Sequence, residues 1–323
     1  MGQGRIKVQV RPVRDFLAIV GATGTGKTGL SIAIAKHLEV EIICMDSRQS
    51  YIGMDIGTDK ISKEVRKIVP HHGFDIRSPD ESYSAGQFAR DAASWIKEIK
   101  GRKCVPMLVG GTGLFLRAIT HPIFREPEVE ESRRRSIREL LTDLPRAKLE
   151  HWVRLLDPDR AKIAIQGGPQ RLSRTIEVAL LTGRSLSWWH KIGASDQKPL
   201  SGMVVVLEVP RGVLDARINN RVNKMAEEGL IIEVQGLLDA GFKVGDPGMT
   251  GTGYREIASY VEGLCSLDQA LEIMKMRTRK YARRQVTWFK NQHEAGTLRV
   301  DGTESLEIQC SKILTEWTRT DGM

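Results

Sequence analysis

The chain has 323 residues, of which 41% are hydrophobic and 28% charged; this excludes wholesale disorder and predicts about two globular domains. Its formal net charge of +9 indicates a polyanionic partner such as a nucleic acid. Short apolar runs, a basic N-terminus without an apolar signal segment and widely spaced cysteines exclude membrane and secreted proteins, so we expect a cytoplasmic one with no membrane partner.

The first 115 residues alternate between buried strands and helices. Apolar runs predict strands at Phe16–Val20, Val40–Met45 and Val105–Val109, and a helix over Leu30–Leu38 follows the first of them. Each strand runs directly into a loop of glycines or polar residues. This order is typical of a parallel α/β sheet, in which ligands bind at the carboxyl ends of the strands.

A basic helical segment then interrupts this pattern. Between Arg117 and Lys198 there are 16 basic and 11 acidic residues, with helical spacing throughout. A buried strand returns at Met203–Val209, a helical stretch follows over Leu214–Leu238, and a short strand and a helix come after Thr297. We therefore expect an α/β core over residues 1–120 and 200–323, and an all-helical insertion over residues 121–199.

A phosphate-binding motif, G-x-x-x-x-G-K-[ST], follows the first strand. It comprises Gly21, Ala22, Thr23, Gly24, Thr25, Gly26, Lys27 and Thr28. The glycines let backbone N–H groups turn towards a phosphate chain, and the N-terminus of the next helix adds its positive dipole. Lys27 is expected to neutralise phosphate oxygens and Thr28 to bind Mg²⁺. The core is thus predicted to be a P-loop NTPase-like parallel sheet flanked by helices, and the motif alone equally fits a small-molecule kinase.

Three other residues occupy positions where chemistry is expected. Asp46 follows the second strand and could be a metal ligand, a general base or a helix cap. Thr112 follows two glycines and either presents its hydroxyl to a ligand or serves the turn. Arg255 opens a predicted helix and either clamps a phosphate or lies on the surface.

Two helical segments have strongly basic faces. In Pro169–Gly183 the basic and amide side chains share one arc, and apolar side chains lie opposite; Pro169 suits the first turn and Gly183 the C-terminal cap. Lys275–Lys290 has seven basic residues and no acidic one, with Tyr281 on its apolar side. Unbalanced positive charge of this kind favours contact with nucleic acid.

Eight segments, in order, carry a resemblance to a known family. They are GATGTGKT (21–28), DSRQSY (46–51), GMDIGT (53–58), HHGFDIRSPDESYSAGQF (71–88), LVGGTGLF (108–115), PQRLSRTIEV (169–178), GTGYRE (251–256) and RKYARRQVTWFK (279–290). With them the chain resembles the bacterial tRNA dimethylallyltransferases, also called tRNA isopentenyltransferases. The resemblance implies transfer of a dimethylallyl group from its diphosphate to the exocyclic amine of the adenine immediately 3′ of the anticodon, in tRNAs that read codons beginning with U.

The resemblance also implies roles for individual residues. Asp46 would be the general base on the adenine amine, with Thr112 beside it as a second catalytic residue. The diphosphate would be held by residues 21–28 and Arg255, with Mg²⁺ on Thr28. The tRNA anticodon stem-loop would contact Asp46, Ser47, Arg48, Gln49, Thr112, Gln170, Arg171, Leu172, Ser173 and Arg174. The resemblance thus implies tRNA and dimethylallyl diphosphate as partners, and we expect a monomer.

The sequence departs from the family pattern at three positions. Ser50 replaces a usual Val, Phe115 a usual Tyr, and Glu130 an Arg expected to contact tRNA. Three other functions remain open: an adenylate isopentenyltransferase acting on free nucleotide, a P-loop kinase and a non-enzymatic RNA-binding module. The basic insertion argues against the free-nucleotide enzyme and the kinase. A non-enzymatic RNA-binding module would have no use for the phosphate loop.

Overall fold

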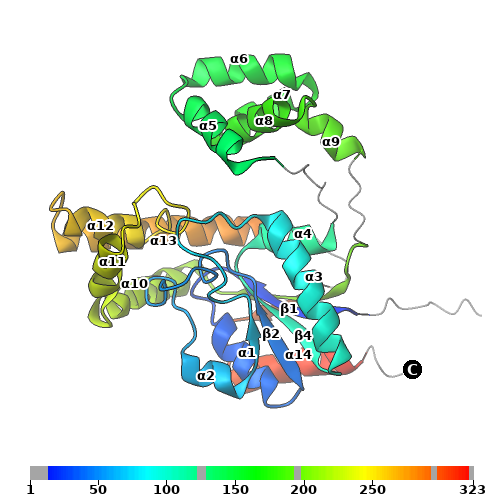
Figure 1. The fold of residues 1–323 in the computed structure, drawn as a ribbon. Coiled ribbons are helices and arrows are strands. Elements are labelled where there is room, and N and C mark those ends of the chain that lie inside the picture. Colours follow the sequence, from blue (N-terminus) through cyan, green and yellow to red (C-terminus); the bar gives the residue numbers. More distant parts are fainter. Residues whose placement is uncertain (1–13, 122–128, 193–197, 292–296, 320–323) are drawn as a thin grey trace, which may run out of the picture. The chain divides into compact units, whose positions relative to one another are not determined.

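The computed structural model describes residues 14–121, 129–192, 198–291 and 297–319 (Figure 1). The chain divides into two compact units, a core unit of residues 1–120 and 200–323 and an insertion of residues 121–199. In the described part of the chain, none of the helices combines the length and the apolar character that crossing a membrane requires.

A parallel sheet is the centre of the core unit (Figure 1). Among the described residues it has six strands in the order β3-β2-β4-β1-β5-β6, and every neighbouring pair is parallel. The strands are β1 (Phe16–Gly21), β2 (Val40–Cys44), β3 (His71–His72), β4 (Val105–Gly110), β5 (Gly202–Glu208) and β6 (Leu298–Asp301). The expected α/β fold with a parallel sheet is confirmed, and only the two-residue β3 lacked a sequence prediction.

Helices pack on this sheet and beside it. Those of the core unit are α1 (Lys27–Ala35), α2 (Lys63–Ile68), α3 (Ala85–Gly101), α4 (Gly113–Thr120), α10 (Arg211–Glu227), α11 (Leu230–Asp239), α12 (Tyr254–Val261), α13 (Leu267–Asn291) and α14 (Leu306–Thr318). Alternate residues of the strands, such as Leu17 and Ile19, pack with α1 and α14 in one buried cluster. On α3, Ser84 and Gln87 form a reciprocal capping box that stabilises the start of the helix.

The helical stretch predicted over Leu214–Leu238 is two helices rather than one. Gly229 has φ +105°, a left-handed conformation that glycine adopts without steric cost and that ends a helix. The chain turns there from α10 into α11, and these helices build a second buried cluster with α12 and α13. This cluster supports the loops at one side of the strand ends.

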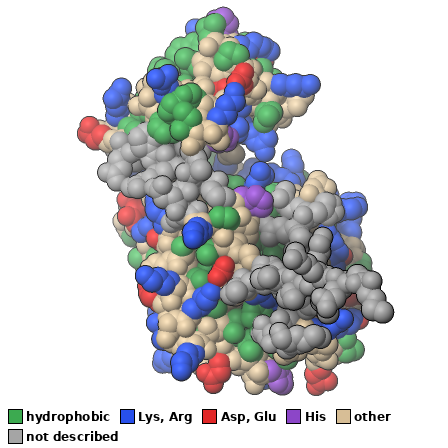
Figure 2. All heavy atoms as spheres, turned by 90° about the vertical axis from the view of Figure 1, so that its right-hand side faces the viewer, with side chains coloured by type: hydrophobic (Ala, Val, Ile, Leu, Met, Phe, Trp, Pro, Cys, Tyr) green, Lys and Arg blue, Asp and Glu red, His purple; other side chains and the backbone are tan. Residues whose placement is uncertain are grey.

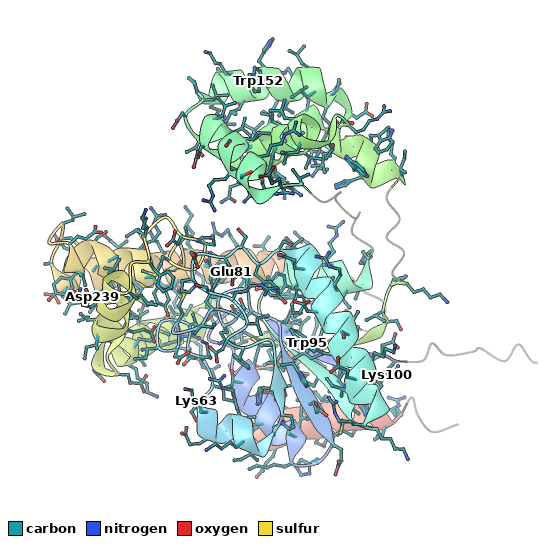
Figure 3. All side chains as sticks on the ribbon, in the orientation of Figure 1. Lys63, Glu81, Trp95, Lys100, Trp152 and Asp239 are labelled. Carbon is teal, nitrogen blue, oxygen red and sulfur yellow. The ribbon has the colours of Figure 1, made fainter. Side chains whose placement is uncertain are left out.

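The insertion has its own helical core. Its elements are α5 (Glu131–Thr142), α6 (Arg146–Leu156), η1 (Pro158–Arg160), α7 (Ala161–Gln166), α8 (Pro169–Thr182) and α9 (Leu186–Ile192). Leu149, Val153, Leu172 and Ile176 are buried in one cluster, and Trp152 of α6 packs against it (Figure 3). Helix α8 starts at proline and ends at Gly183 with φ +69°, as the sequence predicted.

Candidate active site

The phosphate loop lies between β1 and α1, where the carboxyl end of a strand meets the start of a helix. Gly24 and Gly26 have φ +82° and +96°, left-handed values that bend the loop around the helix N-terminus. The Lys27 ammonium donates to the carbonyl of Ala22 at 2.7 Å, and the Thr28 side chain is exposed. This geometry is typical of a site for phosphate oxygens.

The Lys27 ammonium is electrostatically tuned. Its pKa is lowered from 10.5 to about 8, chiefly by burial and also by the nearby Arg221, while the Asp46 carboxylate acts in the opposite direction. Lys27 therefore lies close enough to Asp46 and Arg221 for their charges to act on it. Because the ammonium is poorly solvated, an anion placed beside it gains a strong interaction.

Asp46 and Thr112 are brought together at the ends of β2 and β4. Asp46 Oδ1 accepts the N–H of Arg48 at 2.9 Å, and Thr112 Oγ1 accepts the N–H of Ser47 at 3.2 Å. The two loops can approach this closely because residue 110 is glycine. A Cβ at that position would collide with the backbone of Met45. The predicted neighbourhood of Asp46 and Thr112 is thus present, and the N–H bond at Oδ1 orients the carboxylate.

A cavity of about 300 Å³ opens beside these loops. Its lining residues are Thr23, Asp46, Ser47, Arg48, Gly57, Thr58, Arg221, Val222, Met225, Thr250, Thr252, Met274, Thr278, Tyr281 and Arg284. The phosphate loop reaches it through Thr23, and the second strand end reaches it through Asp46. One cavity therefore joins a phosphate-binding loop, a carboxylate and an apolar side formed by Val222, Met225 and Met274.

Arg221 is a site residue that the sequence analysis missed. From α10 its guanidinium donates to Thr23 Oγ1 at 3.1 Å and pairs with Asp59 at 3.0 Å. It therefore places a permanent positive charge at the phosphate-loop end of the cavity. Nothing local distinguishes it from the other charged residues of an amphipathic helix, so only the tertiary structure could identify it.

Tyr281 is the second missed residue. The helical wheel assigned it to the apolar side of Lys275–Lys290, but it lines the cavity together with Asp46. Burial and the Asp46 carboxylate raise the pKa of its phenol to about 12, while the Thr112 hydroxyl acts in the opposite direction. Its hydroxyl is thus a neutral hydrogen-bond donor at neutral pH.

The loop that contains Gly57 and Thr58 is held by Glu233 of α11. Its carboxylate accepts the backbone N–H groups of Asp55, Ile56 and Gly57 at 2.7–3.0 Å and the Tyr254 hydroxyl at 2.6 Å. Multiple donors to one carboxylate stabilise the loop strongly. This explains why the segment GMDIGT forms a wall of the cavity.

The other residues predicted to bind tRNA or the diphosphate lie partly in the cavity and partly outside it. Gln49 donates to the carbonyls of Thr58 and Asp59 and so stabilises the loop that forms one wall of the cavity. Arg48 lines the cavity and also donates to the carbonyl of Pro247 at 2.6 Å. Arg255 is exposed on α12 and does not line the cavity, so its role as a diphosphate ligand stays a prediction.

The basic face of α8 is less uniform than predicted. Gln170 and Arg171 are exposed, but Arg174 donates to the buried carboxylate of Glu177 at 3.1 Å. Arg134 and Arg138 of α5 also bind this carboxylate. Figure 2 shows Lys and Arg side chains distributed over one face of the insertion.

The predicted contact of Leu172 with tRNA stays a prediction, and the position of the residue in the structure does not favour it. Its side chain is fully buried in the insertion core, where it packs with Ile176. Direct contact with nucleic acid would require that core to open. Ser173, its neighbour, is half-buried.

The unbalanced charge of Lys275–Lys290 is partly balanced by neighbouring elements. Arg277 pairs with Glu256 of α12, and Arg283 pairs with Asp215 of α10 at 3.2 Å. Lys275 pairs with Glu272 at 2.8 Å, just before the segment. These three cations therefore have intramolecular partners, and the run carries less free charge than its sequence indicates.

The three departures from the family pattern all fit the structure. Ser50 is buried, and its hydroxyl donates to the carbonyl of Ser47 at 3.3 Å. Phe115 is also buried and stacks on Phe88 with ring centroids 4.2 Å apart, so its environment is apolar. Glu130 precedes α5 and accepts the hydroxyl of Ser132.

Comparisons with known proteins identify the family. The model of the IPP transferase family matches residues 49–292, and that of isopentenyl transferases matches residues 14–68. The chain belongs to the IPP transferase family. It is an enzyme of that type, which confirms the resemblance inferred from its motifs.

Relatives match nearly the whole chain. A tRNA dimethylallyltransferase 2 of Geotalea uraniireducens is 38% identical over 93% of this chain and 96% of its own length. A tRNA dimethylallyltransferase of Thermotoga petrophila is 39% identical over 86% of this chain and 90% of its own. Among solved structures, the full-length tRNA isopentenylpyrophosphate transferase of Bacillus halodurans is 34% identical and superposes with a TM-score of 0.68. That comparison covers 95% of this chain and 97% of the other.

Proposed function

We propose that this enzyme transfers a dimethylallyl group from dimethylallyl diphosphate to the exocyclic amine of an adenine in tRNA. Its relatives are tRNA dimethylallyltransferases. The observation that carries the proposal is the single cavity lined by Thr23 of the phosphate loop and by Asp46. A diphosphate leaving group and a base for the acceptor amine are the two requirements of this reaction.

The residues can perform the transfer without a covalent enzyme intermediate. The bond between carbon 1 of the dimethylallyl group and the diphosphate oxygen breaks, and the adenine amine nitrogen forms a new bond to that carbon. The amine proton passes to the Asp46 carboxylate, which acts as general base. Lys27, Arg221 and the N–H groups of the phosphate loop stabilise the charge that develops on the diphosphate.

The donor set fits Mg²⁺ as the companion of the diphosphate. Mg²⁺ binds hard oxygen ligands and is usually held by one or two protein oxygens together with substrate phosphates. In the described parts of the chain, no group of three or more His, Cys, Asp or Glu residues could hold a metal by itself. The exposed Thr28 hydroxyl would therefore hold the ion together with the diphosphate oxygens, and the ion would supply positive charge to the leaving diphosphate.

We infer that the tRNA partner is bound through its anticodon stem-loop, at the adenine immediately 3′ of the anticodon in tRNAs reading codons that begin with U. Gln170 and Arg171 are exposed on α8, where an amide and a guanidinium suit RNA phosphates and bases. A buried acceptor amine requires the base to leave its stack. We place this reaction in the cytoplasm and propose that the enzyme acts as a monomer.

One experiment separates this function from its alternatives. The purified protein is incubated with dimethylallyl diphosphate and one acceptor at a time: unmodified tRNA, AMP or ATP. The mass of each product is then measured by mass spectrometry. We expect a mass increase of one dimethylallyl group in tRNA alone, on the adenine 3′ of the anticodon. Efficient prenylation of AMP or ATP would overturn the tRNA assignment in favour of a free-nucleotide enzyme. Phosphate transfer from ATP to a small molecule would support a kinase.

A further inference from the structure

A buried glutamine joins the two chemical halves of the site. Gln285 lies on α13 and is 6% exposed. Its Oε1 accepts the backbone N–H of Thr23 at 2.9 Å, and its Nε2 donates to the carbonyl of Gly111 at 2.9 Å. One amide group therefore bridges the phosphate loop and the loop that carries Thr112.

The chemistry of this bridge selects glutamine. A backbone N–H can only donate and a carbonyl can only accept, so the bridging side chain must offer one acceptor and one donor at once. A carboxylate has no donor, and an apolar chain has neither. The partner loop is shaped for this side chain, because a Cβ on Gly111 would collide with Gln285 Nε2.

The bridge continues into the groups that face the cavity. On one side, Thr23 also accepts the Arg221 guanidinium at 3.1 Å through its hydroxyl. On the other side, Thr112 follows Gly111 and accepts the N–H of Ser47, the residue after Asp46. One turn further along α13, Trp288 packs so closely on Gly113 that a Cβ there would collide with its ring. Helix α13 therefore docks on this loop at two points.

We propose that Gln285 is a positioning residue that sets the separation between the diphosphate-binding loop and the Asp46–Thr112 loops. This proposal rests on the function proposed above. An in-line transfer requires the leaving oxygen, the reacting carbon and the acceptor nitrogen to be aligned, and the two loops hold opposite ends of that line. The amide acts at a distance from the reacting atoms, through the backbone of both loops.

The test compares two buried glutamines of the same unit. Gln285→Met keeps the length of the side chain and removes both hydrogen bonds. Gln309 of α14 is 4% exposed and donates to the carbonyl of Glu304 at 2.7 Å, so Gln309→Met is the matched control. We expect both variants to fold and to lose stability in urea unfolding, with the larger loss in Gln285→Met, because it breaks two hydrogen bonds and Gln309→Met breaks one.

The value of kcat distinguishes a residue that positions the two loops for the reaction from one that only stabilises the fold. With folded protein and saturating tRNA, Gln285→Met should lower kcat about a hundred-fold, as expected for a small misplacement of reacting groups. Gln309→Met should leave kcat unchanged. In combination with Thr112→Ala, the loss from Gln285→Met should be smaller than in the native background, because both act through one loop. Equal kcat values for the two methionine variants would overturn the proposal.

A binding measurement keeps the proposal distinct from the proposed function. Calorimetry with inorganic diphosphate and Mg²⁺ should show weaker binding to Gln285→Met, by several-fold, and native affinity for Gln309→Met. If the native enzyme prenylates no acceptor, the proposed function fails while this difference still supports a positioned phosphate loop. If diphosphate binds equally to all three proteins, the positioning role is wrong whatever the reaction.

Discussion

At the scale of single residues, Asp46 has the central part in the proposed chemistry. Its Oδ1 accepts the N–H of Arg48, and the carboxylate faces a cavity shared with Thr23 of the phosphate loop. That arrangement excludes the helix-cap role for Asp46, because the hydrogen bond is to a turn rather than to the start of a helix, and it leaves the general base and the metal ligand. A general base and a metal ligand make different kinetic predictions.

Asp46→Asn tests these two roles. If Asp46 removes the amine proton, kcat should fall by about 10²–10⁴-fold while tRNA affinity is retained, because a positioned base contributes that much. Asp80→Asn, a change at an exposed aspartate, is the control and should leave kcat unaffected. A rise in KM for the diphosphate without a loss of kcat would indicate a metal ligand instead.

Because the pKa of Lys27 is lowered, we expect diphosphate binding to depend on pH. Its pKa is lowered to about 8, so the ammonium loses its proton as the pH rises through that value. Diphosphate binding should therefore weaken above about pH 8, and KM for dimethylallyl diphosphate should rise there. In Lys27→Arg the guanidinium stays charged throughout this range, so the additional rise should vanish. The same pH profile in both proteins would exclude Lys27 as its origin.

At the scale of secondary-structure elements, the insertion helices α5 and α8 are joined by one buried carboxylate. Glu177 is 4% exposed and binds Arg134 at 2.7 Å and Arg174 at 3.1 Å. Removal of one member of a buried ion cluster leaves the others without compensation. Arg174 therefore contributes to the insertion fold, whatever it contributes to tRNA binding.

Glu177→Gln should destabilise the insertion by about 3 kcal/mol, the lower range for a broken buried ion pair. Urea unfolding followed by tryptophan fluorescence reports this loss, because Trp152 packs in the same insertion core. Glu150→Gln is the control, since Glu150 forms an i,i+4 pair with the exposed Arg146 that contributes little. Similar unfolding midpoints for the two variants would show that the carboxylate does not hold these helices together.

Arg171 is exposed, so we expect its substitution to affect tRNA binding rather than the stability of the insertion. Arg171→Ala should weaken tRNA binding with little change in stability, whereas Arg174→Ala should lower both. Filter binding of tRNA and urea unfolding, measured on both proteins, distinguish the two arginines. Loss of stability without loss of binding in either variant would remove that arginine from the tRNA surface.

At the scale of the whole molecule, the net charge of +9 predicts salt-sensitive association with tRNA. The logarithm of the affinity should fall linearly with the logarithm of salt concentration, with a slope of roughly −0.7 to −0.9 per phosphate contacted. Because Arg277 and Arg283 already have acidic partners, we expect fewer contacts than the charge of α13 indicates. Affinity that is independent of salt would contradict an electrostatic mode of binding.

The sequence by itself determined the parallel α/β fold, the phosphate loop and the nearness of Asp46 to the strand ends. These features depend on local patterns, namely apolar runs, glycine spacing and the position of a residue directly after a strand. The break of the predicted Leu214–Leu238 helix at Gly229 was also readable in principle, since glycine ends helices, but helical spacing on both sides obscured it.

Only the tertiary structure decided which side chains share the cavity. Arg221 comes from α10 and Tyr281 from α13, far from the phosphate loop in sequence, and the bridge from Thr23 through Gln285 to Gly111 joins three separate segments. Periodicity tells which face of a helix is buried, but it does not tell what that face is buried against. The partners of a buried polar group depend on long-range packing, so they are fixed only when the sheet and its helices are assembled.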